Sequence, residues 1–139
     1  MAQTFTLDIR TPSGMAWQGD AAIVTLPGSQ GRFQVLVNHA PLVTELEVGE
    51  IRIKDSAGKE HRFASSGGFA EVRLNDVTVL SETIEPIEQI DVDRAEKALA
   101  RAIERIKTRR TNPSSDIDAS RAEAALARAE NRLKLVARL

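Results

Sequence analysis

The sequence predicts an α+β protein in which an antiparallel β-sandwich or barrel is followed by an antiparallel hairpin of two helices. Apolar residues alternate with polar ones up to about residue 80, turn residues interrupt this alternation at short intervals, and the apolar period becomes helical after Pro86. We therefore expect a β-domain over residues 1–86 and a helical domain over residues 87–139.

Period-two alternation predicts the strands of the N-terminal part. Phe5, Leu7 and Ile9 alternate with polar residues, so one face of this strand is expected to be buried. Segments rich in glycine, proline, serine, asparagine and aspartate predict turns at residues 11–14, 27–31, 55–58 and 74–76. Residues 49–65 give the clearest hairpin, and Gly67-Gly68 predicts a bulge or tight corner between two strands.

Two helices are predicted by apolar stripes that consist mainly of alanine. The stripes are Ala95, Ala98, Leu99, Ala102 and Ile106 in the first helix, and Ala122, Ala125, Leu126, Ala129, Leu133 and Val136 in the second. A break at residues 111–115, which contains Pro113, predicts an antiparallel hairpin. Alanine methyl groups bury little apolar area at roughly 25 cal/mol per Å², so such a hairpin could detach from its base at low cost.

The two predicted helices repeat one another. Residues 90–107 and 117–134 are identical at about two-thirds of their positions, and both open with Ile-Asp-x-x-Arg-Ala-Glu. Asp91 and Asp118 stand where an N-cap belongs, and an aspartate there stabilises a helix by about 1 kcal/mol. Arg94 and Arg121 follow three residues later, so each could also satisfy its own cap.

The later arginines fit a purely capping role less well. Arg101 and Arg105, like Arg128 and Arg132, are four residues apart, which places like charges side by side at a cost of a few tenths of a kcal/mol. Arg105, Arg128 and Arg132 have no carboxylate three or four residues away. Solvent, the facing helix, an acidic protein surface or a polyphosphate held by bidentate contacts could balance them.

The charge is distributed unevenly along a chain whose formal net charge is −1. Residues 90–139 hold 12 Lys and Arg against 8 Asp and Glu, and residues 1–89 hold 7 against 12, giving net charges of +4 and −5. A basic helical segment can indicate nucleic-acid binding, but this one has no aromatic residue to stack on bases and no basic run beyond Arg109-Arg110. We expect no nucleic-acid partner.

Composition and motifs argue against an enzyme. The absence of cysteine excludes disulfides, thiol catalysis and cysteine-ligated zinc. Gly58-Lys59 is followed by Glu60, so the sequence has no phosphate-binding P-loop. His39 and His61 stand apart without a motif that would make either one a metal ligand or a general base. We therefore expect no catalytic residues and no metal site.

Hydropathy gives no sign of a membrane-inserted segment. The opening MAQTFTLDIR lacks a basic segment followed by an apolar one, so we expect no signal peptide. No apolar run approaches the roughly 20 residues that span a bilayer. We expect no direct membrane insertion, so work at a membrane would require a partner.

The chain resembles the epsilon-subunit family of bacterial F-type ATP synthase over essentially its full length. The resemblance rests on TFTLDIRTPSG, NHAPLVTELEVGEIRI, SGGFAEVRLNDVTVL and the duplicated arginine-rich helices. It implies a flattened sandwich of about ten strands that binds the gamma subunit and the ring of c subunits, followed by a mobile hairpin. It also implies a non-catalytic central-stalk subunit, peripheral on the cytoplasmic face of the bacterial plasma membrane, that couples rotation to ion flow and inhibits ATP hydrolysis.

The same resemblance implies two uses of the hairpin. In an extended form the helices reach the alpha and beta subunits, and Arg121, Arg128 and Arg132 would meet acidic residues of beta. In a compact form some members bind ATP, as a regulatory ligand and not an obligatory cofactor, through an Ile/Leu-Asp-x-x-Arg-Ala motif that residues 90–95 match. The residues implied in ATP binding are Glu85, Ile90, Asp91, Arg94, Ala95, Arg101, Arg128 and Arg132.

One loop departs from the family pattern. The resemblance places Arg32 and His39 near the c ring, but many members carry an acidic residue where this chain has Arg32, and proline and glycine where it has Val37 and Asn38. A reversed charge should repel a basic loop of the ring unless that loop differs too.

Two alternatives to a stalk subunit remain at this point. The chain could be a stand-alone ATP-sensing module, or a structural adaptor whose helices dimerise. Co-purification with a gamma subunit separates the first interpretation from these two, because a stalk subunit must form a stable complex with it.

Overall fold

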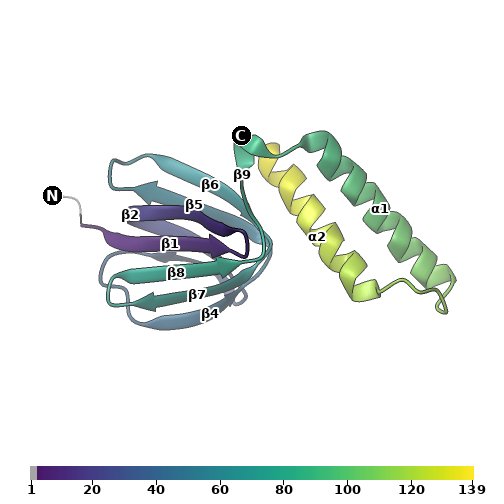
Figure 1. Ribbon diagram of the computed structural model, residues 1–139, viewed down its shortest axis with the longest axis horizontal. Coiled ribbons are helices and arrows are strands. Elements are labelled where there is room, and N and C mark those ends of the chain that lie inside the picture. Colours follow the sequence, from purple (N-terminus) through teal and green to yellow (C-terminus); the bar gives the residue numbers. More distant parts are fainter. Residues whose placement is uncertain (1–2) are drawn as a thin grey trace. The chain divides into compact units, whose positions relative to one another are not determined.

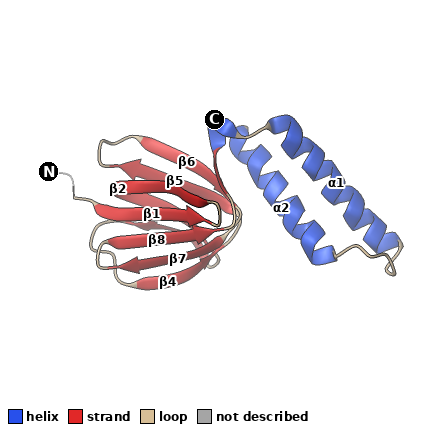
Figure 2. Ribbon diagram, in the orientation of Figure 1, coloured by secondary structure: helices blue, strands red, loops and turns tan. Residues whose placement is uncertain are grey.

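The computed structural model describes residues 3–139, which divide into a β-domain that ends at Pro86 and a helical unit that begins at Ile87. Figure 1 shows the order of the elements, and Figure 2 shows that the strands belong to the first unit and the two long helices to the second. The expected α+β class is confirmed. Met1 and Ala2, the start of the segment in which we expect no signal peptide, lie outside the described residues.

Nine strands build the β-domain within the described residues. They are β1 (Phe5–Thr11), β2 (Gly14–Gly28), β3 (Gly31–Val35), β4 (Leu42–Leu46), β5 (Gly49–Asp55), β6 (Glu60–Ser65), β7 (Gly68–Arg73), β8 (Asp76–Ser81) and β9 (Ile84–Pro86). Their order is β1-β8-β7-β4-β2-β5-β6-β9, with β3 paired to β2 and β1 paired to β2 as well. All pairs are antiparallel except β1 with β8.

The 15-residue strand β2 connects the parts of the domain. Its first half pairs with β1, and its second half pairs with β3 and β5. The pairing with β5 shifts register between Ala21 and Ile23, an irregularity that lets one strand bend between two partners. One long strand therefore pairs with several others, and the nine strands of the described residues agree with the expected number of about ten.

The core of the β-domain contains the residues that alternation marks as buried. Leu7 and Ile9 of the alternating N-terminal strand are fully buried in one cluster with Leu26, Ile51 and Ile53. Each such side chain contributes about 1.5–3 kcal/mol relative to an exposed one, so this cluster is the main stabilising term of the domain.

The hairpin expected at residues 49–65 is formed by β5 and β6, with Gly49 opposite Ser65 and Lys54 opposite Glu60. Asp55 holds its turn, because Asp55 Oδ1 accepts the backbone N–H groups of Ala57 and Lys59 at 2.9 Å each. Asp55 Oδ2 lies 2.8 Å from His61 Nε2. The His61 side chain, followed by the Lys59 backbone N–H, lowers the pKa of Asp55 below its ordinary value and keeps this carboxyl charged.

The corner expected at Gly67-Gly68 is also present. Both glycines have positive φ, 97° and 146°, and a Cβ on Gly68 would collide with the carbonyl oxygen of Leu80. Only glycine fits this corner, since β7 must approach β8 closely here.

The second unit comprises a short 3-10 helix η1 (Ile87–Gln89) and the helices α1 (Val92–Thr111) and α2 (Ala119–Val136). Figure 1 shows α1 and α2 side by side, joined by the loop that contains Pro113. Within residues 3–139, neither helix is long and apolar enough to cross a bilayer.

Candidate functional site

Both helices of the hairpin begin at the expected aspartate caps. Asp91 Oδ1 accepts the backbone N–H of Arg94 at 3.0 Å, and Asp118 Oδ1 accepts that of Arg121 at 3.2 Å. The caps are thus satisfied by the arginine backbones, and the guanidinium groups form no ion pair with them. These side chains remain available for other partners.

Alanines form the closely packed seam between α1 and α2. Ala95 and Ala102 of α1 and Ala122 and Ala129 of α2 are buried, and each pair is spaced seven residues apart. Larger side chains are buried mainly at the base of the hairpin, where η1 packs against α2 and both Ile87 and Leu135 are buried. The hairpin is therefore held by small contacts along its length and by larger ones at its base.

Five arginines of the hairpin take no part in the ion pairs of residues 3–139. Arg94, Arg101, Arg105 and Arg121 are exposed, and Arg128 is half-buried. Within residues 3–139 no ion pair joins any of these five to a carboxylate. The facing helix, one of the four partners considered from the sequence, does not balance Arg105 or Arg128.

A pocket of about 620 Å³ lies at the loop end of the hairpin. Arg105 lines it from α1, and Arg121 and Arg128 line it from α2. Asp116, Ile117 and Asp118, together with alanines of α2, complete the wall. The pocket offers guanidinium donors on some sides and carboxylate acceptors on others, which suits a ligand with both phosphates and hydroxyl or amino groups.

The residues expected to bind ATP lie in different places. Arg128 lines the pocket, but Asp91, Arg94 and Arg101 do not. Ala95 is buried in the seam, and Ile90 is half-buried in the turn after η1, where its N–H donates to Ile87 O at 3.2 Å. Arg132 is half-buried on α2, and Glu85 lies on β9, opposite Ala64, in the other unit. ATP binding by these residues remains a prediction.

The sequence reasoning did not mark Arg105, Asp116 or Asp118 as site residues. The signal was present, because residues 117–122 repeat the Ile-Asp-x-x-Arg-Ala motif of residues 90–95. The pocket lies on this second copy.

The loop that departs from the family pattern, around Asn38 and His39, is held by hydrogen bonds. Asn38 has φ 64°, a conformation that glycine adopts freely and asparagine tolerates. Its backbone N–H donates to Asn75 Oδ1 at 2.6 Å, and Asn75 Nδ2 donates to Asn38 Oδ1 at 3.0 Å. Half-buried His39 follows, with its Nδ1 2.6 Å from Ala40 O. The loop is therefore tied to the turn between β7 and β8.

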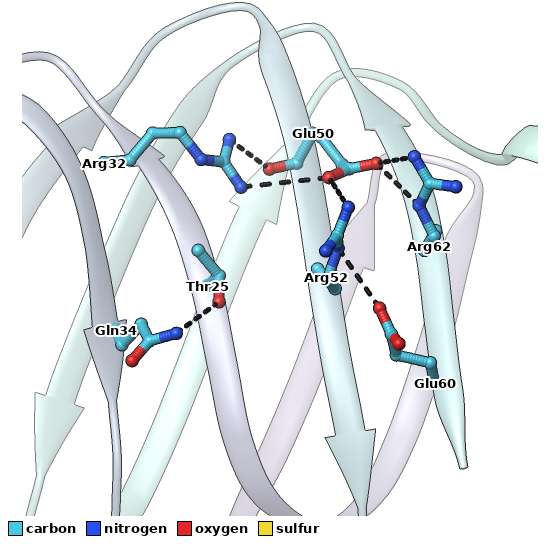
Figure 3. A network of polar contacts seen from close by, with 7 residues as sticks. All are labelled: Thr25, Arg32, Gln34, Glu50, Arg52, Glu60 and Arg62. Carbon is cyan, nitrogen blue, oxygen red and sulfur yellow. Dashed lines mark hydrogen bonds and ion pairs between the residues drawn. The ribbon is translucent and has the colours of Figure 1, made fainter. Parts of the chain in front are cut away.

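Arg32 belongs to a charged network centred on Glu50 (Figure 3). Arg32 Nη1 donates to the Glu50 carbonyl oxygen at 3.0 Å, and its Nη2 lies 4.0 Å from Glu50 Oε1. Arg62 contacts Glu50 Oε2 through Nε at 2.8 Å and Nη2 at 2.6 Å, and Arg52 Nη2 lies 3.1 Å from Oε1. Arg52 also reaches Glu60 at 3.2 Å. Arg32 is thus oriented by its own domain.

Glu50 is nearly buried, with 8% of its surface exposed, and three arginines surround it. Replacing it by glutamine leaves these cations without their shared carboxylate. We expect Glu50→Gln to lower the free energy of unfolding by about 2 kcal/mol, measured by urea denaturation.

Glu60→Gln is the matched control for this substitution. The Glu60 side chain is 54% exposed and contacts only Arg52 in the network, so its loss should cost less than about 1 kcal/mol. Equal effects of the two substitutions would contradict the central role of Glu50.

Comparisons with known proteins agree on one family. The model described as ATP synthase, Delta/Epsilon chain, beta-sandwich domain matches residues 4–87, and the one described as ATP synthase, Delta/Epsilon chain, long alpha-helix domain matches residues 88–137. The ATP synthase epsilon chain of Desulfitobacterium hafniense is 46% identical over 109 residues, which are 78% of this chain and 82% of that protein. The ATP synthase epsilon chain of Salinibacter ruber is 44% identical over 115 residues, 77% of each chain.

A solved structure supports the same relationship. A chain in the structure of the Euglena gracilis mitochondrial ATP synthase, comprising OSCP, F1 and c-ring, matches with a TM-score of 0.78 and 26% identity. The match covers 96% of this chain and 81% of that one.

Proposed function

Since the chain belongs to the epsilon-chain family of ATP synthase, a non-catalytic subunit of the central stalk, we propose that it couples stalk rotation to ion flow and inhibits ATP hydrolysis through α1 and α2. We place it at the cytoplasmic face of the bacterial plasma membrane, because the two epsilon chains named above come from bacteria. The observation that carries the inhibitory role is a hairpin with a weak seam and two arginines, Arg121 and Arg128, that form no ion pair within residues 3–139.

Free energies favour a hairpin that can open when a partner supplies carboxylates. The four seam alanines contribute about 3 kcal/mol, since each buried methyl contributes roughly 0.8 kcal/mol. A hydrogen bond to a charged group contributes about 1.5–3 kcal/mol. Two or three such bonds from Arg121, Arg128 and Arg132 to acidic residues of the beta subunit would therefore offset the loss of the seam.

Removal of the hairpin tests inhibition directly. We expect a chain that ends at Glu88 to assemble with the other subunits and to raise ATP hydrolysis by the reconstituted enzyme, because the β-domain has its own core. The full-length variant with Arg121, Arg128 and Arg132 changed to glutamine should reproduce the increase. Arg110→Gln, at an exposed arginine near the end of α1 that belongs to neither proposed set, serves as the control. Unchanged hydrolysis in the shortened chain would exclude an inhibitory hairpin.

An exposed apolar patch on the β-domain is the surface that we propose for the gamma subunit. Phe69 of β7 and Leu80 of β8 are directly opposite each other and are 58% and 52% exposed. Val43 of β4, 73% exposed, is opposite Glu71 and therefore diagonal to Phe69. Exposed apolar groups that cluster across neighbouring strands mark interaction surfaces. A pocket of about 470 Å³, lined partly by Phe69 and Leu80, adjoins them.

Substitutions in this patch should weaken gamma binding without unfolding the domain. We expect Phe69→Ser and Leu80→Ser each to reduce affinity for purified gamma subunit at least tenfold, measured by surface plasmon resonance. Leu74→Ser is the control, since Leu74 is 81% exposed but lies in the turn between β7 and β8. A loss of the same size for Leu74→Ser would point to general destabilisation, and unchanged affinity in all three would move the gamma site elsewhere.

The compact hairpin is also proposed to bind ATP at the first repeat. Arg94 and Arg101 of α1, with Arg128 and Arg132 of α2, would contact the phosphates, and Glu85, Ile90, Asp91 and Ala95 would complete the site. Guanidinium groups bind phosphate oxygens in bidentate fashion, and in this chain Arg94 and Arg101 are exposed and form no ion pair within residues 3–139.

Titration calorimetry with ATP tests this site. We expect saturable binding by the full chain and at least a tenfold loss of affinity in Arg94→Gln and in Arg128→Ala. Arg110→Gln is the control, because Arg110 is an exposed arginine at the C-terminal end of α1 and belongs to neither proposed set. Equal heats for the wild type and all variants would remove the phosphate role.

A further inference from the structure

The second copy of the Ile-Asp-x-x-Arg-Ala motif forms part of the pocket at the loop end of the hairpin. Ile117, Asp118, Arg121 and Ala122 are the motif residues of this copy, and all four line the pocket. The first copy, at the opposite end of α1, contributes no residue to it.

The pocket combines residues that correspond to one another in the two repeats. When residues 90–107 are aligned with 117–134, Arg121 corresponds to Arg94 and Arg128 corresponds to Arg101. The buried alanines match in the same way, Ala95 with Ala122 and Ala102 with Ala129. Each end of the seam therefore carries a capping aspartate and two arginines seven residues apart, and Arg105 of the facing helix joins the set at the loop end.

We propose that this pocket is a second binding site, which takes a nucleoside polyphosphate and is separate from the proposed site at the first repeat. Three guanidinium groups line it, and none has a carboxylate partner within residues 3–139. Its volume of about 620 Å³ lies within the range of small-molecule sites, about 300–1,000 Å³.

The two aspartates in the wall of the pocket favour a nucleotide over an inorganic phosphate as its ligand. Asp116 and Asp118 leave the lining with a net charge of only +1 against three arginines, so charge alone would favour an inorganic anion weakly. A charged carboxylate only accepts hydrogen bonds, which suits the hydroxyl groups of a ribose or the amino group of a base. The guanidinium groups suit phosphate oxygens. The pocket therefore matches a ligand that carries both kinds of group.

Occupancy of this site would act on the hairpin as a whole. Arg121 and Arg128 line the pocket in the compact hairpin, and the proposed inhibition uses the same two side chains in another contact. A ligand that binds only the compact form stabilises it by mass action. This regulatory consequence rests on the proposed function, whereas the site itself rests on the pocket.

Stoichiometry in the full chain tests the site. Arg105→Gln with Arg121→Gln alters the second site, Arg94→Gln with Arg101→Gln alters the first, and Arg128 stays unchanged because both proposals use it. Arginine and glutamine have similar helix propensities, and thermal unfolding by circular dichroism checks that each variant keeps its helices. By calorimetry we expect two ATP molecules per wild-type chain and one per chain of either double variant.

The outcomes separate the two sites. Binding by the Arg105/Arg121 variant that equals the wild type in stoichiometry and affinity would overturn the second site. Loss in that variant with none in the Arg94/Arg101 variant would support the second site and contradict the first. Chemical shifts of the backbone amides of Ser120 and Arg121, compared with those of Asp93 and Arg94, give an independent assignment of each ligand.

The choice of a nucleotide has its own test. Tripolyphosphate serves as the second probe. We expect the Arg94/Arg101 variant to bind ATP at least tenfold more tightly than it binds tripolyphosphate. Asp116→Asn in that background should weaken ATP binding and leave tripolyphosphate binding unchanged or stronger; Asp116 does not cap the helix, so the change leaves the Asp118 cap in place. Equal affinities for the two probes would overturn the assignment to a nucleotide.

Discussion

The alanine seam between α1 and α2 is the constraint on which the helical unit depends. Methyl groups at Ala95, Ala102, Ala122 and Ala129 let the helices approach closely and bury little area while doing so. Leucines at the same four positions would add several kcal/mol of burial and would hold the helices farther apart. Close approach brings arginines of both helices to one pocket, and small burial keeps the hairpin easy to open. One choice of side chain thus produces both properties.

In the β-domain, by contrast, three arginines contact one residue of the same domain. Arg52 and Arg62 share the nearly buried carboxylate of Glu50, and Arg32 donates to the carbonyl oxygen of the same residue. The contacts of this network meet at one nearly buried side chain, because only 8% of the Glu50 surface is exposed. Arg105, Arg121 and Arg128 of the hairpin have no such carboxylate within residues 3–139, although the chain has slightly more acidic than basic residues overall. Their unpaired state follows from where the carboxylates lie and not from a shortage of them, which favours an external ligand or partner.

Local patterns account for the parts of the structure that the sequence predicted well. Alternation at Phe5, Leu7 and Ile9 and the caps at Asp91 and Asp118 depend on neighbours within a few residues, so they could be read without a fold. The Glu50 network joins positions 18 and 12 residues apart through strand register, which a one-dimensional pattern does not contain. The bend of β2 could not be predicted from the sequence for the same reason, since it depends on which strands pair with β2. At the second repeat the motif was visible, but only the fold shows that Arg105 of the other helix faces it.

Arg128 links the proposals for the hairpin, because its nucleotide contacts belong to the compact form and its contact with the beta subunit belongs to the extended form. It lines the pocket of the second repeat, corresponds to Arg101 of the first, and belongs to the groups proposed for the first ATP site and for the beta subunit. Half-buried on the compact hairpin, it would exchange one set of acceptors for another when the helices separate. Nucleotide and the beta subunit therefore compete for Arg128, and any ligand that it holds in the compact form opposes the extended form by its own binding free energy. Affinity for nucleotide and strength of inhibition should then vary inversely among substitutions that leave Arg121, Arg128 and Arg132 in place.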